Sequence, residues 1–329
     1  PTGEIMAGAG VGTSGGTVAF GVSENNFLGR GIEFATNINV SEESLRGLIS
    51  LSNPNYKGSN RSLNASLEST VTDRLTNFGY KSNKTGFSVG SGFEFYDDLY
   101  WNTGISSYIE KLDTDNTASA SMKKQEGSYF DTFYNHTFSY DKRNQKYQAS
   151  DGYISRFTQN IPLISESYTL TNIYDYKIYN EWLDENVFSI GFFGKTTNSL
   201  SGKDVKLSDR LYLPASKLRG FESGKVGPKD GNDYIGGNYA ASINIATTLP
   251  QILPNLQNTN FSIFFDVANI WGIDYDSALN DESKIRSSVG ISVDLLTPVG
   301  PLNFSLSEPI TKGNNDITES FRFDIGTTF

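Results

Sequence analysis

The sequence has no cysteine, a single histidine and only two methionines among its 329 residues. Without cysteine, the chain can form no disulfide, hold no metal through thiolates and use no cysteine nucleophile. Asp and Glu (37) exceed Lys and Arg (27), and the resulting net charge of −10 argues against a nucleic-acid-binding surface. No stretch approaches roughly 18 consecutive apolar residues, so the sequence contains no transmembrane helix.

Glycine and aromatic residues are abundant instead, with 32 Gly, 22 Phe and 18 Tyr. In the last third of the chain, apolar and polar residues alternate strictly. Ile263 and Phe265, for example, share one face of a segment whose other face carries Ser262 and Asp266. A period of two is typical of β-strands with one apolar and one polar face. The clearest segments are residues 239–246, 261–271, 289–295, 302–307 and 321–326, and looser ones are residues 18–22, 32–40, 45–51, 63–67, 87–95, 101–109, 130–140, 153–161, 168–178 and 187–193.

Two folds fit this alternation: a soluble sandwich with a dry core, and a membrane barrel with its apolar residues outside. The polar face is rich in Gly, Ser and Asn, as a lumen requires, rather than in the Lys and Glu of a solvated sheet. Aromatic residues lie near expected strand ends, where the aromatic girdles of a membrane barrel form at the membrane–water interfaces; examples are Trp101, Tyr140, Tyr153 and Trp271. We therefore predict an all-β fold, a closed antiparallel transmembrane β-barrel.

At about 10 residues per tilted strand plus turns, the chain accommodates about sixteen strands. We expect one domain over residues 1–329, with no convincing helical segment and no inter-domain linker. Long polar stretches are expected to be surface loops, namely residues 113–127, 196–213, 223–237 and 273–283.

The most informative stretch is the loop of residues 209–237, which contains several glycines and Pro228. A loop this long is either disordered or ordered by specific contacts. If it folds into the lumen, Arg219 needs an acceptor, because an unpaired buried charge is very costly. Asp266, on the polar face of a nearby strand, is the natural candidate for a bidentate contact. By composition alone, an ordinary solvated surface arginine is the favoured alternative.

Short motifs occur along the whole chain, and most specifically after residue 208. They are FGV at 20–22, ENNFLGRG at 24–31, LRGF at 218–221, GP at 227–228, GGN at 236–238, NIW at 269–271, RSSVG at 286–290, PVGPL at 298–302 and FDIGTTF at 323–329. In this order they resemble the BamA-type barrel-assembly insertases. LRGF, GP and GGN resemble the family's sixth extracellular loop, and the others resemble its first hairpin, closing strands and terminal strand.

The resemblance implies an outer-membrane protein that folds and inserts other β-barrels through a lateral seam between its first and last strands. It assigns Arg219, Gly220 and Phe221 to the lumen loop. The implied gate residues are Gly8, Gly10, Gly12, Phe323, Ile325 and Gly326. The residues give this a physical basis, because interior glycines weaken a strand and an unpaired edge templates another strand. A frayed first strand with no role is the alternative.

The family often places an acidic residue on the strand after the sixth loop, facing the loop arginine. The corresponding residue here is Asn244, which can accept a hydrogen bond but adds no charge. We therefore expect the loop anchor to rest mainly on Asp266. The chain ends on Phe329 after an alternating stretch, which is similar to the sorting signal of outer-membrane barrels in general.

The resemblance also implies unfolded outer-membrane proteins as substrates, and membrane lipids and lipopolysaccharide as surroundings. Barrel-assembly lipoproteins would bind through POTRA domains, which we expect to be missing here because the chain begins at the barrel. Residues 1–6 lack the features of a signal peptide, so we expect a mature or truncated product. No cofactor, metal or nucleic-acid partner is implied.

Alternatives within the family are a TamA-type translocation and assembly protein or a two-partner secretion transporter, and an alternative outside it is a passive diffusion porin. An enzyme is disfavoured. A barrel phospholipase would need a Ser–His pair, but His136 and Ser139 are an odd number apart and point to opposite faces of a strand. A histidine at the membrane interface or facing lipid is the simpler interpretation.

Overall fold

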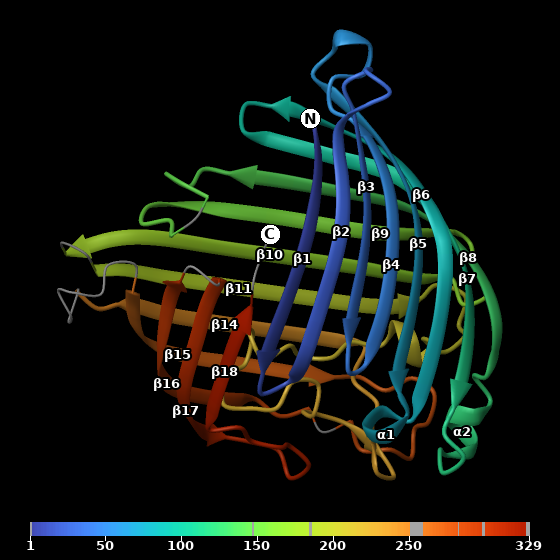
Figure 1. Ribbon diagram of the computed structural model, residues 1–329. Helices are drawn as coiled ribbons and strands as arrows, with labels where there is room; N and C mark the ends of the chain where they lie inside the picture. The colour runs from blue at the N-terminus through green and yellow to red at the C-terminus, as the bar shows by residue number, and fades with distance from the viewer. Residues whose placement is uncertain are drawn as a thin grey trace.

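The computed structural model describes residues 2–146, 148–183, 186–250, 259–281, 283–297 and 300–326. Sixteen antiparallel strands pair in chain order, and the first pairs with the last to close a barrel (Figure 1). The predicted fold class is therefore confirmed. The strands are β1 (Gly3–Gly12), β2 (Gly15–Phe27), β3 (Ile32–Ser41), β4 (Ser44–Asn53), β5 (Arg61–Arg74), β6 (Tyr80–Tyr96), β7 (Leu99–Thr114), β8 (Gly127–Asp141), β9 (Gly152–Ile164), β10 (Thr169–Leu183), β11 (Asn186–Ser199), β14 (Tyr239–Thr248), β15 (Thr259–Trp271), β16 (Arg286–Thr297), β17 (Gly300–Thr311) and β18 (Phe321–Gly326).

The two faces of the strands decide between the sandwich and the membrane barrel. On β15, Ile263 and Phe265 are 43% and 37% exposed and point outward, whereas Asp266 is fully buried inside. Apolar residues outside and polar residues inside are the reverse of a soluble sandwich, and they match a membrane-spanning barrel. The apolar side chains that alternate along the strands thus form the outer surface of the protein.

The strands differ in length around the barrel. β6 has 17 residues and β7 has 16, whereas the described part of β18 has 6. The alternation at residues 101–109 predicted only part of β7, which continues to Thr114 through charged residues. Backbone pairing does not require an apolar face once a strand leaves the membrane, so polar extensions of this kind carry no alternation signal.

Two short helices, α1 (Leu75–Phe78) and α2 (Ala120–Lys123), lie in loops at one end of the barrel (Figure 1). We call this end of the barrel the loop end. The two helices were not expected from the sequence, because four residues cannot show a helical period. Within the described residues, no helix is long and apolar enough to cross a membrane.

The longest connection at the loop end joins β11 to β14, and we call residues 200–238 the long loop. The expected loop of residues 196–213 began too early, because its first four residues complete β11. The long loop contains a 3₁₀ turn, η2 (Leu207–Asp209), and a small hairpin of β12 (Lys229–Asp230) and β13 (Asp233–Tyr234). A further 3₁₀ turn, η1 (Tyr56–Gly58), lies between β4 and β5.

The hydrophobic clusters inside the protein contain residues of the long loop. Leu218 and Phe221 pack with Phe193 of β11 and Ile270 of β15 in one cluster. Leu207, Tyr234 and Ile235 pack with Phe78 of α1 in another. Burial of these side chains, each worth about 1.5–3 kcal/mol, holds the long loop against the inner wall.

A matched pair of substitutions on β15 tests the assignment of the faces. We expect Phe265→Arg, at mid-strand on the outer face, to destabilise the barrel in vesicles by at least about 2–4 kcal/mol. Asn260→Arg places the same charge beside polar residues on the inner face, where Asn260 is paired with Asp294, and should be nearly neutral. Equilibrium unfolding in denaturant measures both, and equal losses would contradict the assignment.

Candidate functional site

Among the described residues, the seam between β1 and β18 is the shortest pairing in the barrel. Up to Gly326, where the described part of β18 ends, it comprises three residue pairs at the loop end of β1, joining Gly10, Val11 and Gly12 to Gly326, Ile325 and Asp324. One further bond runs from the amide of Thr13 to the carbonyl of Phe323 at 3.0 Å. Within the described residues, every other neighbouring pair of barrel strands matches over five or more residues. Figure 1 shows β18 meeting β1 near its lower end.

Glycine is a steric requirement at one position of the seam. A Cβ atom on Gly12 would lie 2.4 Å from Oδ1 of Asp324 and 2.7 Å from the carbonyl oxygen of Phe323. Any side chain at residue 12 would therefore push β18 away. Gly8 was expected at the gate, but its described pairing is with Ala19 of β2. Phe329 lies outside the described residues.

Arg219 of the long loop lies against Asp266 of β15. Its Nε and Nη2 donate to the two carboxylate oxygens, each at 2.7 Å, and its backbone amide donates to Oδ2 at 3.1 Å. The guanidinium also lies over the ring of Phe264, 3.4 Å from its centroid. The structure thus brings the loop arginine and the strand carboxylate together in a bidentate contact, which fixes orientation as well as distance.

Asn244 of β14 also lies at the contact with Asp266. Its amide nitrogen donates to Oδ1 of Asp266 at 2.8 Å and to the carbonyl of Lys217 at 2.9 Å. Its Oδ1 accepts a hydrogen bond from Ser242 at 3.2 Å. A second carboxylate in place of Asn244 could not donate to Asp266, whereas the amide of Asn244 does. Its hydrogen bond to Lys217 also ties the loop backbone to the wall.

The two residues after Arg219 pack closely on the wall. Gly220 has a φ of +86°, and a Cβ there would lie 3.2 Å from the Cβ of Ser288 on β16 and 3.1 Å from that of Ser307 on β17. Ser288 donates to the carbonyl of Arg219 at 2.5 Å. Phe221 is 1% exposed. Gly220 and Phe221 are therefore buried, and Arg219 is partly buried, with a side chain that is 20% exposed.

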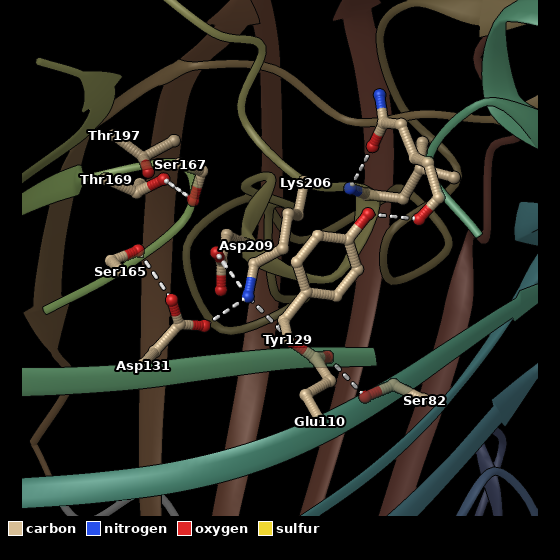
Figure 2. Close-up of polar contacts among 12 residues, drawn as sticks. Ser82, Glu110, Tyr129, Asp131, Ser165, Ser167, Thr169, Thr197, Lys206 and Asp209 are labelled. Atoms are coloured by element: carbon tan, nitrogen blue, oxygen red, sulfur yellow. Dashed lines mark hydrogen bonds and ion pairs between the residues drawn. The ribbon is translucent and has the colours of Figure 1, made fainter. Parts of the chain in front are cut away.

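A second cluster of charges holds the other end of the long loop, and the sequence reading missed it. The Nζ of Lys206 lies 2.8 Å from Glu110 of β7 and 2.6 Å from Asp131 of β8, with Asp209 at 3.5 Å (Figure 2). Ser82 and Ser165 donate to the two strand carboxylates, each at 2.5 Å. We call these six residues the Lys206 cluster.

Burial and neighbouring charges shift the pKa values of the two loop residues in the Lys206 cluster, Lys206 and Asp209. Burial disfavours the ammonium of Lys206, but the nearby carboxylates of Asp209, Glu110 and Asp131 outweigh it and raise the pKa of the lysine. Burial likewise raises the pKa of Asp209, and the Lys206 ammonium opposes this only in part. The lysine is thus held charged among three acids, so it is the residue on which the cluster depends.

A polar cavity of about 1090 Å³ lies beside Arg219. Lys217 and Arg219 line it from the long loop, together with polar residues of β10, β14, β16 and β18. Lys217 forms an ion pair with Asp175 of β10 at 2.9 Å. The ion pairs of the long loop therefore reach β7, β8, β10 and β15.

His136 lies away from this site. Its Nε2 is 3.1 Å from Oε1 of Gln159 on β9, and its ring contacts the rings of Tyr134, Phe138 and Phe157. These neighbours belong to the outward face of the barrel. The interpretation of His136 as an outward-facing residue agrees with this placement.

The class of protein that this arrangement defines is a membrane-spanning β-barrel with a charge-anchored loop inside and a short seam between its first and last strands. A family model described as the Omp85 superfamily domain matches residues 26–329, and the chain belongs to this superfamily.

Known relatives agree with this assignment. Outer membrane protein assembly factor BamA of Neisseria meningitidis serogroup B (strain ATCC BAA-335 / MC58) is 25% identical over 384 residues, which covers 100% of this chain and 47% of that protein. BamA from Haemophilus ducreyi lacking POTRA domains 1–3 has a similar fold, with a TM-score of 0.89, 24% identity, and coverage of 100% of this chain and 70% of that one. CdiB from Acinetobacter baumannii is more distant, with a TM-score of 0.60, 11% identity, and coverage of 99% and 60%.

The resemblance drawn from the motifs is thus confirmed, and the protein is an outer-membrane β-barrel. The chain spans less than half the length of the curated BamA relatives that it matches.

Substitutions of two loop cations should separate a cation that pairs with a buried carboxylate from one that pairs with an exposed carboxylate. Arg219→Ala leaves the fully buried Asp266 without its cation and should cost about 3–5 kcal/mol of stability. Lys217→Ala removes a pair whose side chains are 28% and 40% exposed and should cost at most about 1 kcal/mol. Denaturant unfolding of the two variants measures the difference, and equal effects would show that Arg219 is not an anchor.

Lys206→Met should also cost about 3–5 kcal/mol at pH 7, because it leaves buried carboxylates without a cation. Protonation of a carboxylate removes the unpartnered charge, so the folded variant should bind more protons than the unfolded chain. Its stability should then rise relative to the parent as the pH is lowered from about 7 to about 5. Unfolding measured across this range tests the sign; a loss that does not change with pH would argue against the cluster.

Proposed function

We propose that this barrel assembles other β-barrel proteins into the outer membrane by opening the seam between β1 and β18. The observation that carries the proposal is the short seam: in the described part of the chain β1 and β18 match over three residue pairs, whereas every other neighbouring pair of barrel strands matches over five or more. The names of the BamA relatives support the same function.

A seam of this kind offers both a low barrier to opening and a template. In the described part of the seam, parting β1 from β18 breaks the pairing of three residue pairs and the Thr13–Phe323 bond, and each freed edge presents donors and acceptors in a row. An incoming strand satisfies these groups by adding to the edge. Because the hydrocarbon of the membrane cannot hydrogen-bond a bare edge, the opened seam favours strand addition.

Residues 1–329 act in this proposal as one barrel domain, with the loop of residues 209–237 folded into the lumen. Arg219, Gly220 and Phe221 anchor the loop on Asp266 and Asn244. Gly10, Gly12, Phe323, Ile325 and Gly326 form the working seam, with Gly8 farther along the same edge and Phe329 as the sorting signal. The loop keeps the lumen filled while the seam works.

Unfolded outer-membrane proteins are the proposed substrates, and lipids and lipopolysaccharide border the seam. Barrel-assembly lipoproteins would bind through POTRA domains rather than through the barrel. No covalent step, nucleotide or metal is needed, because pairing of the incoming strand and burial of its apolar face provide the driving force.

A disulfide across the seam tests the proposal, and the absence of cysteine makes the experiment specific. Thr13 and Phe323 form a hydrogen-bonded pair, and hydrogen-bonded and non-hydrogen-bonded pairs alternate along antiparallel strands, so Gly10 and Gly326 form a non-hydrogen-bonded pair. The Cα atoms of such a pair lie about 4.5 Å apart, which suits a disulfide. We expect oxidation of Gly10→Cys/Gly326→Cys in the full-length protein in cells to stop assembly of other barrels. Reductant should restore it.

The control is Ser50→Cys/Ser66→Cys, which joins β4 to β5 away from the seam and should leave assembly unchanged when oxidised. Full assembly with a verified seam disulfide would contradict the lateral-gate function. Secretion of a dedicated substrate, or ion conductance without assembly, would instead favour the transporter or the porin.

A further inference from the structure

The segment just before the last strand pairs with the long loop. The backbone amides of Glu222, Ile317 and Glu319 donate to the carbonyls of Ile317, Lys225 and Gly220, at 2.9, 3.1 and 3.0 Å. Phe221 and Thr318 lie opposite each other in the resulting bridge. The chain passes from the bridge directly into β18, so the Arg-Gly-Phe stretch of the lumen is paired with the segment that leads into the strand that forms the seam.

A buried ion pair fastens this bridge to the wall. Arg286, at the start of β16, donates from Nε and Nη2 to the carboxylate of Asp316 at 2.9 and 3.2 Å, and both side chains are fully buried. The same carboxylate accepts the backbone amide of Gly227 in the long loop at 3.0 Å and that of Gly313 in its own hairpin. Asp316 thus joins β16, the long loop and the β17–β18 hairpin at one point.

The loop side of the bridge cannot shift easily. Gly220 lies so close to Ser288 and Ser307 that a methyl group would need the wall to move, and Phe221 is buried. The hydroxyl of Tyr234 donates to the carbonyl of Asn315 at 2.6 Å, which adds a further contact from the β12–β13 hairpin. The bridge is therefore rigid on its loop side and attached to the wall through Arg286.

We propose that this bridge sets the register of the seam, with Asp316 and Arg286 as positioning residues. The inference rests on the proposed function in that it concerns the same seam. The described part of β18 has 6 residues and meets a glycine-dense β1 over three pairs, and glycine-rich pairings specify register weakly. The bridge fixes residues 317–319, so β18 always emerges at the same height and returns to the same partners after each opening.

Register can be read directly from disulfides formed in the purified full-length protein. Gly10→Cys/Gly326→Cys reports the native register, and Gly10→Cys/Asp324→Cys reports a shift of two residues on the same face. Asp316→Asn keeps the shape of the side chain but removes the charge that holds Arg286. We expect Asp316→Asn to lower the ratio of native to shifted disulfide by at least about 10-fold, as expected for loss of a charge-assisted hydrogen bond.

The matched control is Lys206→Met, which removes another buried charge, this one from the long loop at the β7–β8 wall. It should destabilise the loop without changing the ratio. The rescue is a second disulfide in place of the ion pair: Phe221→Cys/Thr318→Cys added to Asp316→Asn, with the cysteines at the bridge oxidised before those at the seam. It should restore the native ratio when oxidised and not when reduced.

An unchanged ratio in Asp316→Asn, an equal change in Lys206→Met, or a failed rescue would each overturn the inference. These readouts need no assembly activity. If the seam disulfide leaves assembly intact but Asp316→Asn still shifts the register, the proposed function fails and the positioning role stands. If instead the seam disulfide stops assembly and Asp316→Asn leaves the register unchanged, the proposed function stands and the bridge has no part in its mechanism.

Discussion

The rest of this structure depends on one constraint, which is that a strand inside a membrane must have its backbone donors and acceptors paired. Closing sixteen strands into a ring meets that constraint and places the apolar faces outward. Among the described residues the ring is joined by the fewest pairs where β1 meets β18, with three up to Gly326. In the function we propose, this point, which would be a liability in a passive pore, is where the barrel exchanges its own pairing for that of another strand.

The long loop solves a second problem, since its charges have left bulk water and need partners. Arg219 finds Asp266 on β15, and Lys206 finds Glu110 and Asp131 on β7 and β8. The two anchors lie on different parts of the wall, so the loop spans the interior rather than resting on one side. Because Asp316 adds the β17–β18 hairpin to the same network, the lumen and the seam are connected by buried polar contacts.

Much of the fold could be predicted because alternation is a local signal. Ile263 and Asp266 reveal their opposite faces within four residues of sequence, and the polar face of that strand pointed to Asp266 as the acceptor for Arg219. The Lys206 cluster could not be found in this way, because its lysine and glutamate are 96 positions apart. They meet only when the long loop folds against β7 on the inner wall. The polar ends of β6 and β7 were missed because pairing beyond the membrane leaves no apolar pattern.

The most direct test of the central claim is to trap a substrate at the seam. A photoreactive amino acid at Val11, which is 52% exposed on the outer face of β1, would be compared with one at Ile49, which is 47% exposed on β4. The account predicts that barrel proteins caught during assembly crosslink through their terminal strands to residue 11 and not to residue 49. Equal crosslinking at both positions, or none at residue 11 while assembly proceeds, would contradict the claim that substrates enter through the seam.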